Sequence, residues 1–381
     1  MLRVLSSTME RLDLKLAEAF SGIFVSFQWL RMDLVRINAI ENGRLSIAAH
    51  GGAILGHRQS DLVMAFHSGF VSILGRPNAG KSTLLNALVG EKLAIISPKP
   101  QTTRNRILGI IHVPSGRAKR GGQVVLIDTP GVHKPDSSLG RKMMVEVSEA
   151  LEGSNVILLI ADVMQKSAPA DQFVLDMAKR SGTPIFLILN KIDRIEKGKL
   201  LPIIEQWRKL HEFKEIIPIS ALKKNGLDVL LERLLEALPQ GPKYFPEDQL
   251  TDQPTRFMAA EIIREQLLLG TKEEVPYSTT VIVDQFEEGP RLTRIAATIY
   301  CEREGQKRIL IGKGGQMLKK VGTTARIHIE KMLGIKVFLE LFVKVTPGWR
   351  NSRQFVEGLD WRRQLEELAG DRHGNFKPAR S

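Results

Sequence analysis

The sequence has almost no cysteine. Of its 381 residues only Cys301 is a cysteine, which excludes an internal disulfide and a zinc site built from several cysteines, so a reducing compartment is expected. Long apolar runs are also missing. No stretch approaches the roughly 20 apolar residues of a membrane-spanning helix, and the best candidate, residues 19–30, is short and interrupted by polar side chains. We therefore expect a water-soluble protein, at most peripheral to a membrane.

Acidic residues are fewer than basic ones. The chain has 55 Lys and Arg against 42 Asp and Glu, a formal net charge of +13. This surplus favours a polyanionic partner, either nucleic acid or an anionic membrane surface, and charge alone does not choose between them. The length allows two domains or more.

Residues 1–63 carry no recognisable chemistry. Seven Lys or Arg minus six Asp or Glu give this segment a charge of +1, so the basic character belongs to the rest of the chain. Its acidic residues argue against a mitochondrial transit peptide, and no clean apolar core of a secretory signal follows a basic start. We interpret 1–63 as an N-terminal extension that is not native, with the natural start at Met64. The alternative is an amphipathic helical appendage over residues 7–40.

The most informative stretch, residues 75–83, fits the spacing G-x-x-x-x-G-K-[ST]. A strand-type run precedes it at 70–74, and a helical pattern follows at 84–89. Glycines let the backbone wrap closely around phosphates, Lys81 reaches the outer phosphates, and Ser82 can ligate Mg²⁺. The predicted nucleotide cradle comprises Gly75, Arg76, Pro77, Asn78, Ala79, Gly80, Lys81, Ser82 and Thr83.

Two segments after the cradle complete a predicted magnesium site. The polar, proline-broken loop 97–106 can close over a γ-phosphate, with Thr103 as a second oxygen ligand of Mg²⁺. Strands are then expected at 107–113 and 123–127, and the second ends in Asp128, Thr129, Pro130 and Gly131. Asp128 is placed as the Walker-B carboxylate that holds Mg²⁺, and the Gly131 amide can meet the γ-phosphate.

Strands at 156–161, 184–189 and 216–219 alternate with helical stretches, and a further helix is expected at 227–238. This alternation predicts a doubly wound, mainly parallel sheet with ligands at the strands' carboxyl ends. Two of these ends carry the base-recognition residues, which are Asn190, Lys191, Asp193, Ser220, Ala221 and Leu222. Asp193 can accept two hydrogen bonds from guanine, for which adenine has no matching donors, so GTP is expected rather than ATP.

A second domain follows a proline-rich connector. A helix at 256–269, strands at 278–286 and 292–302, an apolar turn at 308–311, a helix at 316–333 and a strand at 336–345 form an α+β pattern. The G-x-x-G loop at 312–315 matches the KH module, whose loop clamps single-stranded nucleic acid. Between Gly305 and Ile329 six residues are basic and none is acidic. The predicted RNA-binding residues are Lys307, Arg308, Gly312, Lys313, Gly314, Gly315, Lys319 and Lys320.

From Met64 to Trp349 the chain resembles the Era family of translation-factor-like GTPases. Besides the GTPase motifs, the resemblance rests on residues 75–78 (Gly-Arg-Pro-Asn), 101–104 (Gln-Thr-Thr-Arg), 245–248 (Phe-Pro-Glu-Asp) and 256–265. It implies a P-loop GTPase domain and a type II KH domain that binds 16S ribosomal RNA near its 3′ end, in assembly and maturation of the small ribosomal subunit.

The resemblance also bears on hydrolysis. Ras-like enzymes place a water-orienting glutamine after DTPG, whereas Val132 stands here. An apolar residue is usual in this class, and the asparagine at the position of Asn78 is associated with a potassium ion that replaces an arginine finger. The expected catalytic residues are Lys81, Asn78, Thr103 and Gly131, with GTP, Mg²⁺ and K⁺ as ligands.

The expected organisation is an extension (1–63), a GTPase domain (64–240), a linker (241–255), a KH domain (256–359) and a tail (360–381) that includes a short helix at 361–369. We expect a cytoplasmic monomer. Two alternatives stay open: a GTPase whose basic surface meets anionic lipid on the cytoplasmic face of the inner membrane, which would not need the G-x-x-G loop, and a P-loop small-molecule kinase, which residues 190–193 disfavour.

Overall fold

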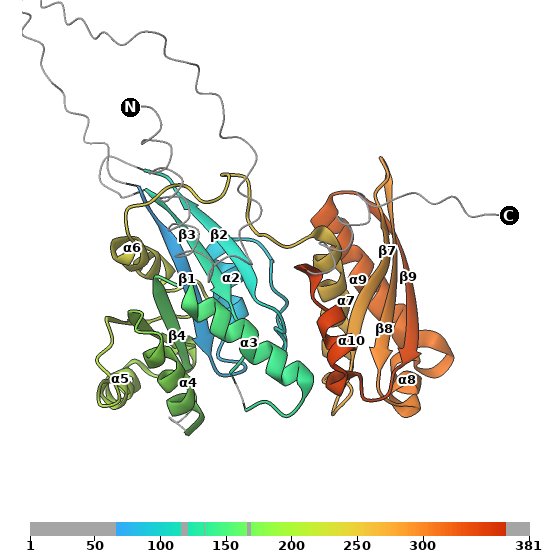
Figure 1. Ribbon diagram of the computed structural model, residues 1–381, viewed down its shortest axis with the longest axis horizontal. Coiled ribbons are helices and arrows are strands. Elements are labelled where there is room, and N and C mark those ends of the chain that lie inside the picture. Colours follow the sequence, from blue (N-terminus) through green and yellow to red (C-terminus); the bar gives the residue numbers. More distant parts are fainter. Residues whose placement is uncertain (1–65, 116–120, 133, 166–168, 363–381) are drawn as a thin grey trace, which may run out of the picture. The chain divides into compact units, whose positions relative to one another are not determined.

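The computed structural model describes residues 66–115, 121–132, 134–165 and 169–362. They form a six-stranded sheet of order β2-β3-β1-β4-β5-β6 and a three-stranded sheet of order β7-β8-β9 (Figure 1). The expected extension and Met64 lie outside these residues, as does the predicted helix at 361–369 beyond its first two residues. No helix in the described part of the chain is long and apolar enough to cross a membrane.

The larger sheet is parallel except at one edge. Strand β2 (Ile107–Val113) runs antiparallel to β3 (Gly122–Asp128). The other strands run parallel to β3, namely β1 (His67–Gly75), β4 (Val156–Asp162), β5 (Ile185–Asn190) and β6 (Glu215–Pro218). All seven residues of β3 are buried, as expected for a strand covered on both faces. The predicted doubly wound fold is confirmed.

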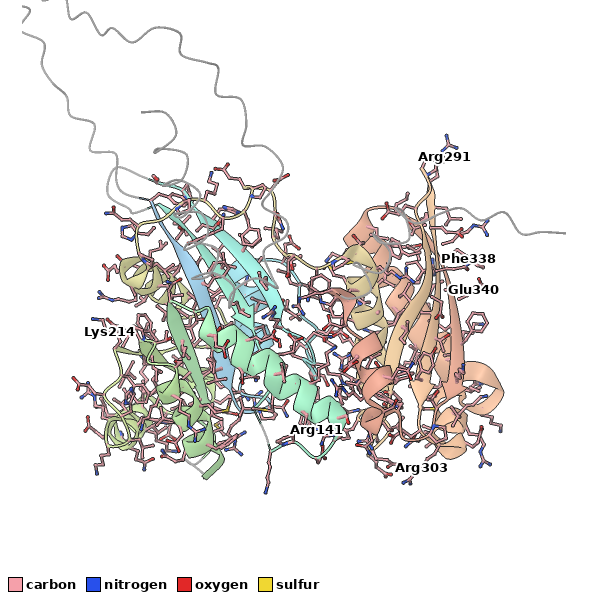
Figure 2. The ribbon with its side chains drawn as sticks, viewed as in Figure 1. Arg141, Lys214, Arg291, Arg303, Phe338 and Glu340 are labelled. Carbon is pink, nitrogen blue, oxygen red and sulfur yellow. The ribbon has the colours of Figure 1, made fainter. Side chains whose placement is uncertain are left out.

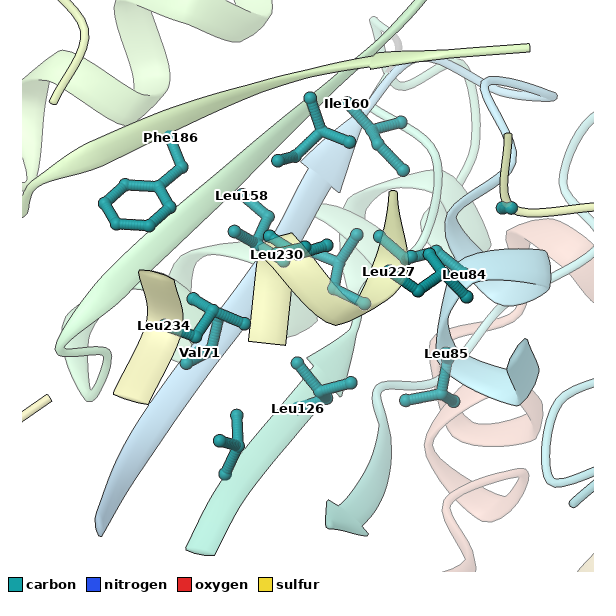
Figure 3. Packing of buried hydrophobic residues seen from close by; sticks show 14 of the residues in the cluster. Val71, Leu84, Leu85, Leu126, Leu158, Ile160, Phe186, Leu227, Leu230 and Leu234 are labelled. Carbon is teal, nitrogen blue, oxygen red and sulfur yellow. The ribbon is translucent and has the colours of Figure 1, made fainter. Parts of the chain in front are cut away.

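Helices cover both faces of this sheet. On one face, Val71 and Leu126 pack with leucines of α2 (Lys81–Val89) and α6 (Leu227–Ala237), as Figure 3 shows. On the other face the sheet packs with α3 (Ser138–Glu152), α4 (Pro169–Arg180) and α5 (Leu200–Arg208). Because the parallel strands end along one edge, Gly75, Asp162 and Asn190 are brought to the same side of the domain, where ligands bind in such folds.

The smaller sheet carries its helices on one face. Strands β7 (Thr280–Glu287) and β8 (Leu292–Cys301) are antiparallel, and β9 (Lys336–Val345) is parallel to β8. Alternate β8 residues face a core shared with α7 (Thr255–Gly270) and α9 (Gln316–Leu333), while Phe338 and Glu340 of β9 are exposed (Figure 2). This is the expected α+β arrangement.

Two details differ from the sequence predictions. The apolar turn predicted at 308–311 is wrong, because these residues end a helix, α8 (Glu304–Ile311). The Gln306 side chain accepts hydrogen bonds from the backbone nitrogens of Glu302 (2.9 Å) and Arg303 (3.1 Å), which starts the helix four residues earlier. Five short elements were not predicted as such: η1 (Ile192–Arg194), η2 (Lys197–Lys199), η3 (Lys313–Gly315), η4 (Trp349–Asn351) and α10 (Arg353–Gly358).

Candidate functional site

The cradle is a tight loop between β1 and α2. Gly80 has φ +101°, and a Cβ there would collide with the Asn190 side chain, so glycine is required. The buried Lys81 ammonium donates to the carbonyls of Gly75 (3.2 Å) and Arg76 (3.0 Å). The loop is therefore closed around the lysine that was predicted to reach the phosphates.

Three oxygens meet beside this lysine. The hydroxyls of Ser82 and Thr103 share a hydrogen bond of 2.8 Å, and Ser82 Oγ donates to Asp128 Oδ2 at 2.7 Å. Thr103 Oγ1 lies 3.3 Å from the same carboxylate oxygen. Asp128 Oδ1 is buried and has no hydrogen-bond partner among the described residues. The three predicted metal ligands are thus brought together, and a carboxylate with two hydroxyls is a donor set of the hard oxygen kind that fits Mg²⁺.

Burial dominates the electrostatics of this cluster. It raises the pKa of Asp128 to about 6, against the opposing effects of Lys81 and of the hydrogen bonds from Ser82 and Thr103. Burial also lowers the pKa of Lys81 to about 8, although Asp128 acts in the opposite direction. Both charged groups therefore lie in an environment of low polarity, in which a cation or phosphate would be held strongly.

Residues 128–132 pack directly against the cradle. Thr129 Oγ1 donates to the Ile73 carbonyl at 2.7 Å, and the Val132 amide donates to the Gly75 carbonyl at 3.2 Å. A Cβ on Gly131 would lie only 2.9 Å from Pro77 Cα, so this contact needs glycine. The Val132 side chain is buried in the core and cannot orient a water molecule.

The two base-recognition segments are joined to the cradle and to each other. Asn190 Nδ2 donates to the Ala79 carbonyl at 2.8 Å, and the Ala221 amide donates to Asn190 Oδ1 at 3.0 Å. Ser220 Oγ donates to Asp193 Oδ1 at 2.5 Å. Asp193 lies in the short helix η1 (Ile192–Arg194), which follows Lys191. The predicted residues therefore form one connected unit.

A cavity of about 350 Å³ runs along these segments. The predicted residues that line it are Pro77, Asn78, Gly80, Lys81, Ser82, Thr83, Thr103, Gly131, Asn190, Lys191, Asp193 and Leu222. The remaining predicted residues are not in the lining, namely Gly75, Arg76, Ala79, Asp128, Thr129, Pro130, Ser220 and Ala221. Most of these support lining residues through the hydrogen bonds described above.

Sequence reasoning missed eight lining residues. They are Ile95, Ile96, Ser97, Pro98, Lys99, Gln101, Thr102 and Arg194. Most belong to the loop 97–106, in which only Thr103 was predicted to bind a ligand. Its composition marked it as a polar loop but gave no sign of which backbone atoms face the cavity.

The same loop is bonded to α7 of the smaller domain. The Ile96 amide donates to Glu265 Oε1 at 3.0 Å. Lys99 Nζ donates to the carbonyls of Leu268 and Thr271, and Arg264 Nη2 donates to the Thr102 carbonyl. Residues that precede Thr103 thus contact α7 and the residue that follows it.

Arg104 extends this connection. Its guanidinium donates to the Thr279 carbonyl at 2.8 Å and lies 5.7 Å from the ring centre of Trp349. Burial, together with the charges of Arg264 and Arg350, lowers the pKa of Arg104 to about 9, although Glu261 opposes the shift. A buried arginine next to Thr103 is held by carbonyl oxygens of the other domain.

The predicted RNA loop stands at the junction of α8 and α9. Gly312, Gly314 and Gly315 have φ values of +74°, +58° and +79°. A Cβ at Gly312 would lie 2.7 Å from Met317 Cβ, whereas Gly314 and Gly315 face open space. The first glycine is required by packing, and the next two leave the backbone open to a ligand.

Basic side chains surround this loop. Five predicted cations, Lys307, Arg308, Lys313, Lys319 and Lys320, are exposed or half-buried and make no ion pair within the described part of the chain. Arg326, the sixth basic residue of the stretch, instead pairs with Glu330 at 3.0 Å. Unpaired positive charge is therefore concentrated around the glycines, as expected for contact with phosphates.

Known proteins share both domains. The family of 50S ribosome-binding GTPases matches residues 70–191, and the KH domain family matches residues 274–350. GTPase Era of Ruminiclostridium cellulolyticum is 49% identical over 300 residues, which cover 78% of this chain and 99% of that protein.

Two solved structures resemble the whole two-domain region. One is a variant of Aquifex aeolicus Era bound to GDP.AlF4⁻, with 42% identity and a TM-score of 0.73. The other is Era in complex with MgGDPNP and nucleotides 1506–1542 of 16S ribosomal RNA, with 42% identity and a TM-score of 0.74. Each comparison covers 77% of this chain and 98% of the other. With its P-loop domain and its KH domain, this GTP-hydrolysing chain belongs to the Era family of GTPases.

Proposed function

We propose that this protein is a GTP-driven RNA-binding switch that binds 16S ribosomal RNA near its 3′ end and assists assembly and maturation of the small ribosomal subunit. The observation that carries this proposal is the position of the loop around Thr103. That residue joins Ser82 and Asp128 in the predicted metal site, and its neighbours Thr102 and Arg104 bond to the KH fold. A change at the γ-phosphate would therefore be transmitted to the RNA-binding domain.

Each part of the nucleotide site receives a proposed role. The cradle, residues 75–83, holds the phosphates, and Ser82, Thr103 and Asp128 hold Mg²⁺, which neutralises phosphate charge when bound. The Gly131 amide faces the γ-phosphate. Asp193 recognises guanine, with Asn190, Lys191 and residues 220–222 completing the base end.

We propose K⁺ as a further cofactor at Asn78. Asn78 Nδ2 donates to the Pro98 carbonyl at 2.8 Å, so this side chain already joins the cradle to the loop. Intrinsic hydrolysis should be faster in potassium than in sodium, and Asn78→Ala should abolish the difference. Equal rates of the unmodified protein in the two salts would remove the potassium role and leave the GTPase activity unaffected.

The RNA role is tested by putting negative charge into the glycine loop. The double variant Lys313→Asp/Gly314→Asp should bind a 16S 3′-end oligonucleotide at least about 100-fold more weakly, because several charge-assisted contacts to phosphate are lost. GTP hydrolysis without RNA should stay near normal. A matched control is Lys331→Asp/Gly334→Asp, which makes the same charge change at another glycine with positive φ and open space. Undiminished RNA binding by the first variant would refute the RNA role.

A second candidate function is peripheral binding to the cytoplasmic face of the inner membrane. The net charge of +13 favours it, since basic surfaces are attracted to anionic lipid. Sedimentation with anionic vesicles tests this directly. Binding that survives Lys313→Asp/Gly314→Asp would favour the membrane over RNA as the target of the basic surface.

The ribosomal subunit that the protein binds, its location in the cell and its oligomeric state are also proposals. The matching GTPase family is described as binding the 50S ribosome, whereas one related structure contains 16S ribosomal RNA of the small subunit. Crosslinking in cells followed by RNA sequencing should therefore compare contacts with the RNA of the two subunits. Contacts concentrated near the 16S 3′ end would support the proposal, and predominant 23S contacts would overturn it. We propose a cytoplasmic monomer, which fractionation and sedimentation analysis would check.

We propose the division into a GTPase domain (64–240), a linker (241–255), a KH domain (256–359) and a tail (360–381). Every motif lies after Met64. A chain that begins there should bind GTP and RNA like the full chain, and loss of either activity would assign residues 1–63 to the working protein.

A further inference from the structure

Asp162 ends β4 directly beside the base-recognition segment. Its Cα is paired across the parallel ladder with Asn190, the residue before Lys191. The carboxylate side chain is only 7% exposed. Asp162 does not line the cavity, but it bonds to a residue that does.

The residue that it contacts is Lys191. Lys191 Nζ lies 2.7 Å from Asp162 Oδ2 and donates to the Asn78 carbonyl at 2.8 Å. The ammonium group is therefore held between the end of β4 and the phosphate cradle. Lys191 lines the cavity, and its φ of +69° turns the chain sharply towards Asp193.

The other carboxylate oxygen fixes the orientation of Asp162. Oδ1 accepts a hydrogen bond from the Met164 amide at 3.0 Å, which leaves Oδ2 for the lysine and, at 3.5 Å, for Gln165 Nε2. A lysine side chain has many rotamers, and one that is 24% exposed would be free to leave without a partner of opposite charge. A partly buried ion pair of this kind is worth more than an exposed one.

We propose that Asp162 is a positioning residue for nucleotide binding, which holds Lys191 against the cradle and beside the base. Because its partner contacts the cradle at Asn78 and not the metal-ligand cluster, Asp162 should affect GDP and GTP equally. Its loss should raise the KM for GTP and leave kcat at saturating GTP nearly unchanged.

The inference rests on the nucleotide role proposed for Lys191, which Lys191→Met tests by itself. If Lys191→Met binds fluorescently labelled GDP like the unmodified protein, the nucleotide role proposed for Lys191 is wrong, and the proposal for Asp162 is wrong with it. If it weakens binding, the role of Asp162 can be judged separately.

The decisive variant is Asp162→Asn, which keeps Oδ1 as an acceptor for the Met164 amide and puts an uncharged NH2 donor where Oδ2 accepts from Lys191. We expect labelled GDP and GTP to bind about 10- to 100-fold more weakly, the range for a lost hydrogen bond to a charged group. The double variant Asp162→Asn/Lys191→Met should be no weaker than Lys191→Met alone. Asp176→Asn, which removes a carboxylate that accepts a hydrogen bond from Gln172 on α4, is the control and should bind normally.

Two results would overturn the proposal. One is unchanged nucleotide affinity in Asp162→Asn. The other is additive losses in the double variant, accompanied by a fall in kcat, which would show that Asp162 supports the fold and not Lys191. Weaker binding of both nucleotides, with kcat kept and losses that do not add, would support it.

Discussion

At the scale of single residues, the base recognition that we propose depends on a carboxylate that accepts a hydrogen bond from one hydroxyl. Ser220 Oγ holds Asp193 Oδ1 at 2.5 Å, and Asp193 lines the cavity. In Asp193→Asn a donor replaces an acceptor, so guanine loses two charge-assisted hydrogen bonds of roughly 1.5–3 kcal/mol each. We expect GTP affinity to fall by more than about 100-fold and preference to shift towards xanthosine triphosphate.

Competition against labelled GDP would measure both affinities. Thermal unfolding serves as the control, since the substitution should leave the fold intact. An unchanged affinity for GTP would contradict the assignment of Asp193.

Two glycines that flank α2 allow a matched test of the cradle. Gly80 and Gly90 have φ values of +101° and +88°, but only Gly80 would bring a Cβ against Asn190. Gly90→Ala should lose about 1–2 kcal/mol of unfolding free energy from backbone strain and keep GTP binding. Gly80→Ala adds a collision with the side chain that bonds Ala79, so nucleotide binding should be lost.

Urea unfolding and GTP binding would separate these effects. If both alanine variants bound GTP equally well, close packing of Asn190 on the cradle would not be needed for the site.

At the scale of elements, the loop around Thr103 contacts two domains. Arg104 donates to the Thr279 carbonyl, whereas Arg106, two residues later, pairs with Glu146 and Glu149 of α3. Arg104→Met should therefore reduce the difference in RNA affinity between the GDP and GTP states. Coupling between two such sites is typically about 1–3 kcal/mol, or 5- to 150-fold in affinity.

RNA affinity measured with GDP and with a GTP analogue gives this difference. Arg106→Met is the matched control, since the carboxylates that pair with its side chain, Glu146 and Glu149, both lie on α3. The coupling assigned to Arg104 would be wrong if both variants reduced the difference equally, or if neither did.

The elements that sequence reasoning predicted well are those with local signals. Helix α9 and strand β9 have the predicted bounds. A glycine flanks each end of the helix, and in both elements apolar residues recur at the spacing typical of that element. Helix α8 was predicted too short, because its start depends on the hydrogen bonds of Gln306. Nothing local marks η4, where Trp349 is buried against Leu139 and Met143, more than 200 positions earlier in the chain.

The residues of the candidate site also divide into those that a local sequence signal marks and those that it does not. The proposed cradle, DTPG and base-recognition residues could be predicted because each motif is contiguous and lies at the end of a strand. Asp162 also ends a strand, but its role depends on pairing of β4 with β5. The contacts of Arg104 and Lys99 join residues about 170 positions apart, and no sequence pattern specifies them.

At the scale of the whole molecule, the positive charge is unevenly paired. Many surface cations elsewhere have acidic neighbours, such as Arg233 with Glu236 and Arg353 with Glu357. The five around the glycine loop make no ion pair with any described residue. A ligand that uses all five would neutralise a compact cluster, whereas a ligand attracted only by net charge would use any exposed lysine equally.

Salt dependence distinguishes these two cases. If the five cations meet phosphates of single-stranded RNA, the logarithm of the binding constant should fall with the logarithm of salt concentration with a slope of about −3.5, since each contact contributes about −0.7. Lys319→Gln/Lys320→Gln should reduce that slope by about 1.4. The control pair Lys331→Gln/Lys344→Gln removes the same charge from exposed positions outside the cluster and should leave the slope nearly unchanged. An equal loss from both pairs would mean that diffuse attraction, as to an anionic membrane surface, governs binding, and the glycine loop would then not be the RNA site.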